Sequence, residues 1–304
     1  MSATMREPAR PAPDPHGGRA ARSPALLRRV WAAIGSAGLR AVAIGLLLFL
    51  ALALVGPLLW GKDPLEVELS SGLQSPSAAH PFGTDELGRD VFARFLVGAR
   101  ISLAVGVCAV FASSVIGTLI GAFTGLVGGV VDAVIGRALD GVLAFPALIM
   151  GMALAVAMGP GPVSVGLAIA VTGVPWYART VRSEVLSLRS REFIDAQRVL
   201  GAPTGHILVR HVLPSVLGGV AVQASLGIAY AVLAIAGLGF LGLGIQPPTP
   251  EWGGMITEGR TYLISGQWWM SIFPGLGILA LVTLSMALGE GLRDHLDPHG
   301  KLRR

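Results

Sequence analysis

Charged residues are scarce in this chain of 304 residues, where they make up 13%, against about 25% in an average soluble domain. Hydrophobic residues make up 53%. A chain with so few charges cannot cover a soluble globular fold with well-solvated side chains. The composition therefore excludes that class and predicts a protein embedded in a lipid bilayer.

Cysteine is nearly absent as well, since Cys108 is the single one and lies within an uncharged run. One thiol excludes a disulfide framework and a thiolate metal site. The six histidines show no metal-ligand spacing with carboxylates, so no metal site is predicted. No nucleophile–base pair is recognisable either, and we expect that this chain is not an enzyme.

A nucleotide-binding motif is also missing. Residues 56–63, GPLLWGKD, nearly match the phosphate-binding loop G-x-x-x-x-G-K-[ST], but Asp63 at the last position would repel phosphate. The sequence predicts no strand before this segment and no helix opening after it. We expect no ATP site and no other cofactor site in this chain.

Five long uncharged runs dominate the sequence. About 20 apolar residues suffice for a helix to cross a bilayer, and each run reaches that length. The Gly-Pro-Gly-Pro sequence at 159–162 is a turn signal that splits the third run into two crossings. The fourth run ends in a Pro-rich segment that cannot be helical, so it holds a single crossing. The sequence predicts an all-α polytopic membrane protein with six transmembrane helices. The runs are 41–61, 101–131, 141–178, 212–250 and 261–289.

These runs contain no Asp, Glu, Lys, Arg or His. Proton- or sodium-coupled carriers usually keep such a residue at membrane depth. The absence disfavours a secondary carrier or channel for small solutes, which nevertheless stays open as the alternative. It predicts that the energy for transport comes from outside this chain.

Basic residues indicate the orientation. With the N-terminus inside, all but five of the 23 lysines and arginines lie in cytoplasmic segments. The net charge of +5 then reflects membrane orientation, and we expect no nucleic-acid binding. Both termini are predicted to be cytoplasmic. The five exceptions are Lys62, Arg89, Arg94, Arg100 and Arg260.

The domain organisation follows from this topology. We expect residues 1–40 to form a cytoplasmic tail, largely disordered to about residue 23 because Arg, Pro, Ala and Gly dominate it. Residues 41–61 would form the first transmembrane helix, which acts as an uncleaved signal anchor. A core at 80–298 would hold five crossings and a cytoplasmic loop at 179–213, and residues 299–304 a C-terminal tail.

One polar island, EFIDAQRVLGAPTGHILVRHVLP at 192–214, lies between the apolar runs. Ser190 is a candidate N-cap, Gly201 a candidate left-handed C-cap, and Pro203 prevents continuation of the helix. A second short segment is expected at 204–211, before the next apolar run opens at Pro214. Three residues of the first helix share an apolar face, namely Phe193, Ala196 and Leu200.

This island resembles the EAA loop of bacterial ABC-importer permeases, in which Glu-Ala-Ala, Gly and a hydrophobic-Leu-Pro tail recur at fixed spacing. Asp195-Ala196-Gln197 stands at Glu-Ala-Ala, Gly201 follows four residues later and Leu213-Pro214 closes the pattern. His211 stands where the general pattern has a hydrophobic residue, as it tends to in the dipeptide/oligopeptide branch. The alternative interpretation is an ordinary amphipathic helix in a cytoplasmic loop.

Further tracts are similar to those of dipeptide, oligopeptide and nickel permeases, in the subunit type with a short first periplasmic loop. They appear in the same order along the chain, from residue 80 to residue 298. The tracts are HPFGTDELGRD at 80–90 with GARISL at 98–103, AFP at 144–146, and FLGLGIQPPTPEWG at 240–253 with GLRDHLDP at 291–298.

The resemblance implies a bacterial plasma-membrane permease that forms half of a translocation pore for di- or oligopeptides or a related small solute. The partners that it implies are a homologous second permease, two ABC ATPases that bind ATP and magnesium, an extracytoplasmic substrate-binding protein and the lipid bilayer.

The resemblance also implies two sets of site residues. The ATPase-coupling residues would be Glu192, Asp195, Ala196, Gln197, Gly201, Leu213 and Pro214. The periplasmic gate or binding-protein contacts would be Asp85, Arg89, Asp90, Glu251 and Trp252.

Structural roles compete with these assignments. The acidic and basic residues at 85–90 are equally consistent with solvated charges at a helix entrance. Trp252, Trp268 and Trp269 are more simply read as an aromatic belt at the membrane interface. A small-xxx-small spacing favours helix packing over a substrate path at Gly117, Gly121 and Gly125.

Overall fold

The computed structural model describes residues 25–296. Our expectations for the first 24 residues and for residues 297–304 lie outside the described residues. The chain divides into residues 1–38 and residues 39–304, and the description below concerns the second unit. The first described helix, α1 (Ala25–Trp60), begins well before the predicted crossing at 41–61 and ends one residue earlier.

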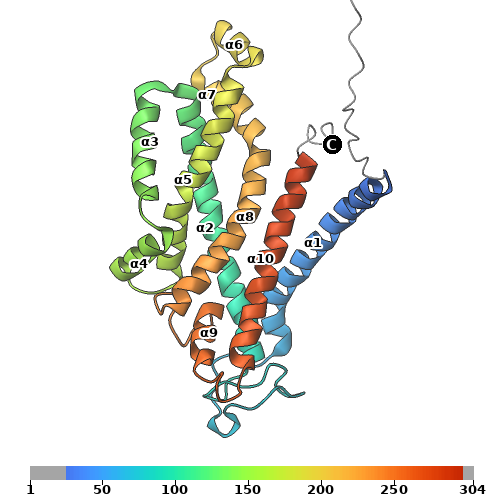
Figure 1. The fold of residues 1–304 in the computed structure, drawn as a ribbon. Coiled ribbons are helices and arrows are strands. Elements are labelled where there is room, and N and C mark those ends of the chain that lie inside the picture. The colour runs from blue at the N-terminus through green and yellow to red at the C-terminus, as the bar shows by residue number, and fades with distance from the viewer. Residues whose placement is uncertain (1–24, 297–304) are drawn as a thin grey trace, which may run out of the picture. The chain divides into compact units, whose positions relative to one another are not determined.

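Helices form nearly all of the regular structure, and no β-sheet occurs within residues 25–296 (Figure 1). The predicted all-α class is therefore confirmed. After α1 come η1 (Leu69–Ser71), α2 (Val91–Val127), α3 (Gly129–Leu143), α4 (Ala147–Met158), α5 (Pro162–Arg189), α6 (Glu192–Val199), α7 (Thr204–Ile207), the π-turn η2 (Leu208–Val212), α8 (Leu213–Phe240), α9 (Trp252–Arg260) and α10 (Trp269–Leu296).

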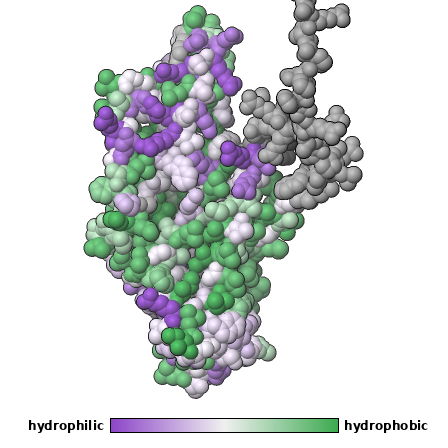
Figure 2. All heavy atoms as spheres, in the orientation of Figure 1, coloured by the Kyte–Doolittle hydropathy of each residue, from purple (hydrophilic) through white to green (hydrophobic). Residues whose placement is uncertain are grey.

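Four of the described helical stretches are long and apolar enough to cross a membrane: Gly38–Trp60, Val91–Val127, Thr204–Phe240 and Trp269–Asp294. The pair α3 and α4, bent by 86°, makes five if it counts as one broken span. Hydrophobic residues cover the middle of the molecule, and hydrophilic ones gather over the end that carries α6 (Figure 2). A polytopic membrane protein is thus confirmed, while the count of six crossings stays a prediction.

The turn between α4 and α5 lies where the sequence predicts it, because α4 ends at Met158 and α5 begins at Pro162. Residues 132–140, which separate the second and third uncharged runs, are part of helix α3. Both of its acidic residues pair with arginines of α5, Asp132 with Arg182 and Asp140 with Arg179. These ion pairs connect α3 to α5.

Within residues 25–296, helices α2 and α5 form the most extensive helix pair. A Cβ atom added at Gly121 would lie 2.3 Å from the Ala178 carbonyl oxygen, and one at Gly117 would lie 2.5 Å from Tyr177 Cβ. Gly125 meets α5 in the same way at Val185. The small-xxx-small spacing therefore serves helix packing, as its sequence context favours.

Two hydrophobic clusters lie near opposite ends of this bundle. One surrounds Trp252 and Leu281 where α2, α9 and α10 meet. The other joins Val181 and Val185 of α5 to Ile194 of α6 and Val216 of α8. Each cluster supports one of the two sets of predicted site residues.

Candidate functional site

Helix α6 begins at Glu192, and Glu192 and Asp195 place acidic groups in its first turn, where the helix dipole favours them. The Arg191 carbonyl accepts hydrogen bonds from the Ile194 and Asp195 N–H groups, at 3.0 and 3.4 Å. Ser190 is not the N-cap of α6. Its N–H donates to the Leu188 carbonyl and its hydroxyl to the Ser187 carbonyl, so that Ser190 ends α5.

The end of α6 is a glycine cap, as the sequence predicts. Gly201 has φ +78°, and the Ala202 N–H donates to the Gln197 carbonyl at 3.0 Å, the six-to-one bond of a Schellman motif. No atom lies within 4 Å of a Cβ built at Gly201. A side chain at this position would therefore act through backbone strain and not through a clash.

The apolar face that the sequence predicts for α6 is not the face that packs against the protein. Ile194 is the fully buried residue of α6 and joins the cluster with Val181, Val185 and Val216. The predicted face is largely exposed, with Phe193 42% and Leu200 79% accessible. The side chain of Val199 is 87% exposed. Ile194 anchors α6, while Phe193, Val199 and Leu200 leave apolar surface uncovered.

The segment after Gly201 does not stop at His211. Helix α7, the π-turn and α8 run together from Thr204 to Phe240, so the prediction of a separate short segment is wrong. The Leu213 N–H donates to the Leu208 carbonyl five residues earlier. Pro214 has no N–H and its ring crowds the carbonyl four residues before it, which explains a wider turn at this point. Leu213 packs against the Ile194 cluster, and Pro214 is exposed.

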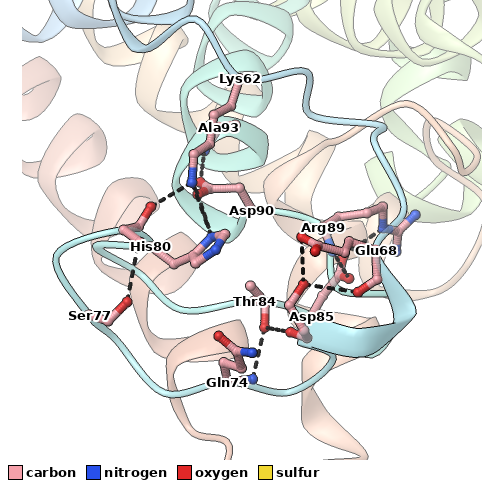
Figure 3. A network of polar contacts seen from close by, with 12 residues as sticks. Lys62, Glu68, Gln74, Ser77, His80, Thr84, Asp85, Arg89, Asp90 and Ala93 are labelled. Carbon is pink, nitrogen blue, oxygen red and sulfur yellow. Dashed lines mark hydrogen bonds and ion pairs between the residues drawn. The ribbon is translucent and has the colours of Figure 1, made fainter.

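Asp90 organises one half of the predicted periplasmic set (Figure 3). Its Oδ1 accepts a hydrogen bond from the Ala93 N–H at 2.8 Å and thereby caps α2. Its Oδ2 lies 2.9 Å from His80 Nδ1 and 3.2 Å from Lys62 Nζ. The loop between α1 and α2 is thus held against the first turn of α2.

Asp85 and Arg89 organise the other half (Figure 3). Asp85 Oδ1 accepts the Leu87 and Arg89 N–H groups, and Arg89 Nε donates to Asp85 Oδ2 at 2.6 Å. Arg94 Nη2 donates to Glu258 Oε2 at 2.7 Å, which extends the network from α2 to α9. Burial raises the pKa of Glu258, while the Arg94 and Arg89 guanidinium groups oppose this rise.

Arg94 and Glu258 were not among the predicted site residues. Arg94 is 2% exposed and Glu258 lies 164 positions further along the chain. The one signal in the sequence was a lone arginine in the first turns of an apolar helix. Its partner has no such signal, because a pair so distant in sequence is visible only in the folded chain.

Within residues 25–296, Asp85, Glu86 and Glu258 form one cluster of carboxylates, with an oxygen of each within 4.8 Å of the others. Arg89 and Arg94 between them pair with all three carboxylates. Guanidinium groups therefore supply the positive charge that this group needs.

Glu251 and Trp252 form the start of α9. The Glu251 carboxylate accepts the Gly253 and Gly254 N–H groups at 2.8 and 3.0 Å and caps the helix. Burial raises the pKa of Glu251, and these two hydrogen bonds oppose the rise. Trp252 is fully buried, stacks on Phe95 at 5.4 Å and donates its Nε1–H to the Phe95 carbonyl.

This burial corrects two interpretations. Asp85, Arg89 and Asp90 are at most 5% exposed, so they are not solvated charges. Trp252 and Trp269 are buried and cannot belong to a lipid-facing aromatic belt, whereas Trp268 is 47% exposed. In this conformation the five predicted periplasmic residues contact their own chain, and contact with a binding protein stays a prediction.

The two sets of residues thus have opposite surroundings. Most of the predicted coupling set lies on α6 or at its cap, next to exposed apolar area, and Leu213 and Pro214 begin α8. The predicted periplasmic set forms buried caps and ion pairs that join α2, α9 and the loop between α1 and α2. Only the first set has a geometry suited to a partner surface.

Comparisons with known proteins agree with this architecture. Residues 117–300 match the family described as binding-protein-dependent transport system inner membrane component. The dipeptide transport system permease protein DppC of Alkalihalophilus pseudofirmus is 43% identical over 83% of both chains. The probable D,D-dipeptide transport system permease protein DdpC of Escherichia coli is 42% identical over 88% of this chain and 90% of its own. The di/tripeptide transport system permease protein DppC of Pseudomonas aeruginosa is 39% identical over 84% and 88%. The chain therefore belongs to the family of inner-membrane components of binding-protein-dependent transport systems.

Proposed function

We propose that this chain is one of two permease subunits of an ATP-driven importer of di- and oligopeptides, and that α6 is its contact with the ATPases. The observation that carries the proposal is the packing of α6, which buries Ile194 and exposes Phe193, Val199 and Leu200. Peptides as substrates are supported by what the relatives' names state for those proteins.

The proposed partners are a homologous second permease, two ATPase subunits that bind ATP and magnesium, and an extracytoplasmic substrate-binding protein. The coupling residues remain Glu192, Asp195, Ala196, Gln197, Gly201, Leu213 and Pro214. ATP-driven movement of the ATPases would push on α6, and the Ile194 cluster would transmit the displacement to α5 and α8. Such coupling requires an element whose position both sites influence.

Reconstitution tests this proposal. The permease pair and the ATPases are placed in liposomes with the binding protein on the opposite side from ATP, and uptake of radiolabelled dialanine is measured. We expect uptake only when ATP, both ATPases and the binding protein are present. ATP-independent uptake by this chain alone would support a secondary carrier instead.

The proposed orientation has its own test. In a Cys108→Ser background, Ser190→Cys at the end of α5 should be unreactive toward an impermeant thiol reagent added outside intact cells. Ser265→Cys, exposed in the turn before α10, should react. Labelling of position 190 from outside would reverse the topology and remove α6 from the cytoplasm.

A further inference from the structure

The long helices expose two different kinds of side chain. From residue 41 onward, every exposed side chain of α1 is aliphatic, as suits contact with lipid tails. The cytoplasmic half of α5 differs. Trp176, Thr180, Ser183 and Ser187 follow one another at i, i+4, i+7 and i+11 and so share one face of the helix.

This face points away from the protein core. Tyr177, Val181 and Val185, on the opposite side of the same half of α5, are buried. Trp176 is 46% exposed, and Ser183 and Ser187 are exposed as well. The neighbouring Arg179 pairs with Asp140 of α3. Glu184, beside Ser183, lies against Gly219 of α8 and forms no ion pair within the described residues.

Helix α8, which packs beside α5 (Figure 1), adds two polar side chains to this face. Gln223 Nε2 donates to Thr180 Oγ1 at 2.9 Å, and its Oε1 is buried without a partner within the described chain. The Tyr230 ring lies 5.4 Å from the Trp176 ring. We call Trp176, Thr180, Ser183, Ser187, Gln223 and Tyr230 the hydroxyl stripe.

The aromatic end of the hydroxyl stripe lies deep in the membrane. Tyr230 precedes the end of α8 at Phe240 by ten residues, about 15 Å along the axis, which is half the thickness of a typical hydrocarbon core of about 30 Å. Tyr230 is 50% exposed, and no hydrogen bond joins its hydroxyl to the described part of the chain. An unpaired hydroxyl in hydrocarbon is unfavourable, and lipid-facing Tyr and Trp normally lie at the interfaces.

We propose that the hydroxyl stripe is this subunit's wall of the solute path. Its chemistry suits a short peptide, because hydroxyl and amide groups exchange hydrogen bonds with peptide N–H and C=O groups. None of the six stripe side chains is charged. The stripe ends at Ser187, just before α6, so a displacement of α6 would change this wall directly. This inference rests on the proposed function for the identity of the solute, but not for the exposure of the wall to water.

Cysteine labelling tests the exposure. In a Cys108→Ser background, Tyr230→Cys and Ser183→Cys are compared with Leu50→Cys, and a charged, water-soluble maleimide is applied to the assembled complex in lipid nanodiscs. Leu50 is 43% exposed and lies ten residues before the end of α1, the same spacing as Tyr230 in α8. Labelling is measured at rest and with the ATPases trapped by ATP and vanadate.

We expect both stripe cysteines to react at least about tenfold faster than Leu50→Cys in one of the two states, because thiolate formation is suppressed in an apolar medium. Labelling as slow as at Leu50→Cys in both states would overturn the proposal. Crosslinking of these cysteines to the partner permease would also overturn it, because the stripe would then belong to the interface between the two permease subunits. Ser183→Cys is nearly isosteric and keeps the test valid if Tyr230→Cys does not assemble.

Peptide specificity is tested separately. An excess of dialanine should slow labelling at Ser183→Cys in the complex that contains the binding protein. Fast labelling that dialanine does not slow would support the exposure of the stripe to water and contradict a peptide as its solute. Slow labelling together with normal dialanine uptake would contradict the stripe as part of the solute path and leave the proposed function intact.

Discussion

The loop between α1 and α2 and the α6 segment both carry motifs that resemble those of the permease family, yet the side chains are buried in the loop and exposed in the α6 segment. In the loop, Asp85, Arg89 and Asp90 of GTDELGRD are buried and paired within the chain. In the α6 segment, Phe193, Val199 and Leu200 are turned outward. A motif rich in charge is therefore not by itself a contact surface. The burial of Asp85 and Arg89 and the exposure of Val199 and Leu200 separate the part that builds the fold from the part that is free to dock.

Removing a buried charge has the largest expected effect on the complex. Arg94→Met removes the guanidinium nearest to Glu258 and leaves Arg89 alone beside the Asp85 and Glu258 carboxylates. Losing one member of a buried pair costs about 3–5 kcal/mol. The matched control is Arg179→Met, because Arg179 and Asp140 are both more than half exposed and exposed pairs contribute about 0–1 kcal/mol. We expect a large fall in the thermal stability of the purified complex for Arg94→Met only. Equal effects would show that the network of Asp85, Arg94 and Glu258 is not structural.

The loop and the α6 segment each contain a glycine with a similar, positive φ. Gly88 has φ +75° and Gly201 φ +78°, but a Cβ at Gly88 would lie 1.9 Å from the Glu68 carbonyl oxygen, and one at Gly201 meets nothing within 4 Å. Both alanine variants acquire backbone strain of about 1–2 kcal/mol, and Gly88→Ala must in addition displace the loop.

We expect Gly88→Ala to reduce assembly of the complex. Gly201→Ala should assemble normally and import less dialanine per ATP hydrolysed. The measurements are the yield of purified complex and the ratio of uptake to ATP hydrolysis. A Gly201→Ala complex with a normal ratio would show that the α6 cap has no part in coupling.

The smallest expected effect concerns pH. Burial raises the pKa of Glu251 above its ordinary value, so the folded protein holds this proton over a range where the unfolded chain has lost it. The resulting stabilisation is complete below the ordinary carboxyl pKa and is lost as the pH rises through the raised pKa. Glu251→Gln should flatten this part of the melting-temperature profile, whereas Glu66→Gln, at an exposed site, should not. Parallel profiles for Glu251→Gln and the parent would contradict the assignment.

Much of the fold could be predicted from composition and from turn chemistry. Uncharged runs indicate membrane helices, the Gly-Pro sequence at 159–162 separates α4 from α5, and Gly201 ends α6 because a positive φ suits glycine. These features depend on local sequence alone.

The rest depends on contacts between distant residues. An eight-residue helix offers several faces of similar hydrophobicity, so periodicity could not distinguish Ile194 from Phe193 and Leu200 as the packed side chain of α6. The burial of Asp85 and Arg94 depends on Glu258, which lies in a different part of the sequence. The π-turn before Pro214 depends on how α7 and α8 join.

Retention of the ATPases by the purified permease pair tests the central claim, that α6 is the docking element, most directly. Val199→Gln is compared with Val130→Gln, since both valines are highly exposed, at 87% and 80%, and Val130 lies at the start of α3. Burying a valine in an interface contributes about 1.5–3 kcal/mol, so Val199→Gln should weaken ATPase binding by roughly tenfold or more while Val130→Gln leaves it unchanged. Equal ATPase binding by both variants would contradict the claim that α6 carries the contact.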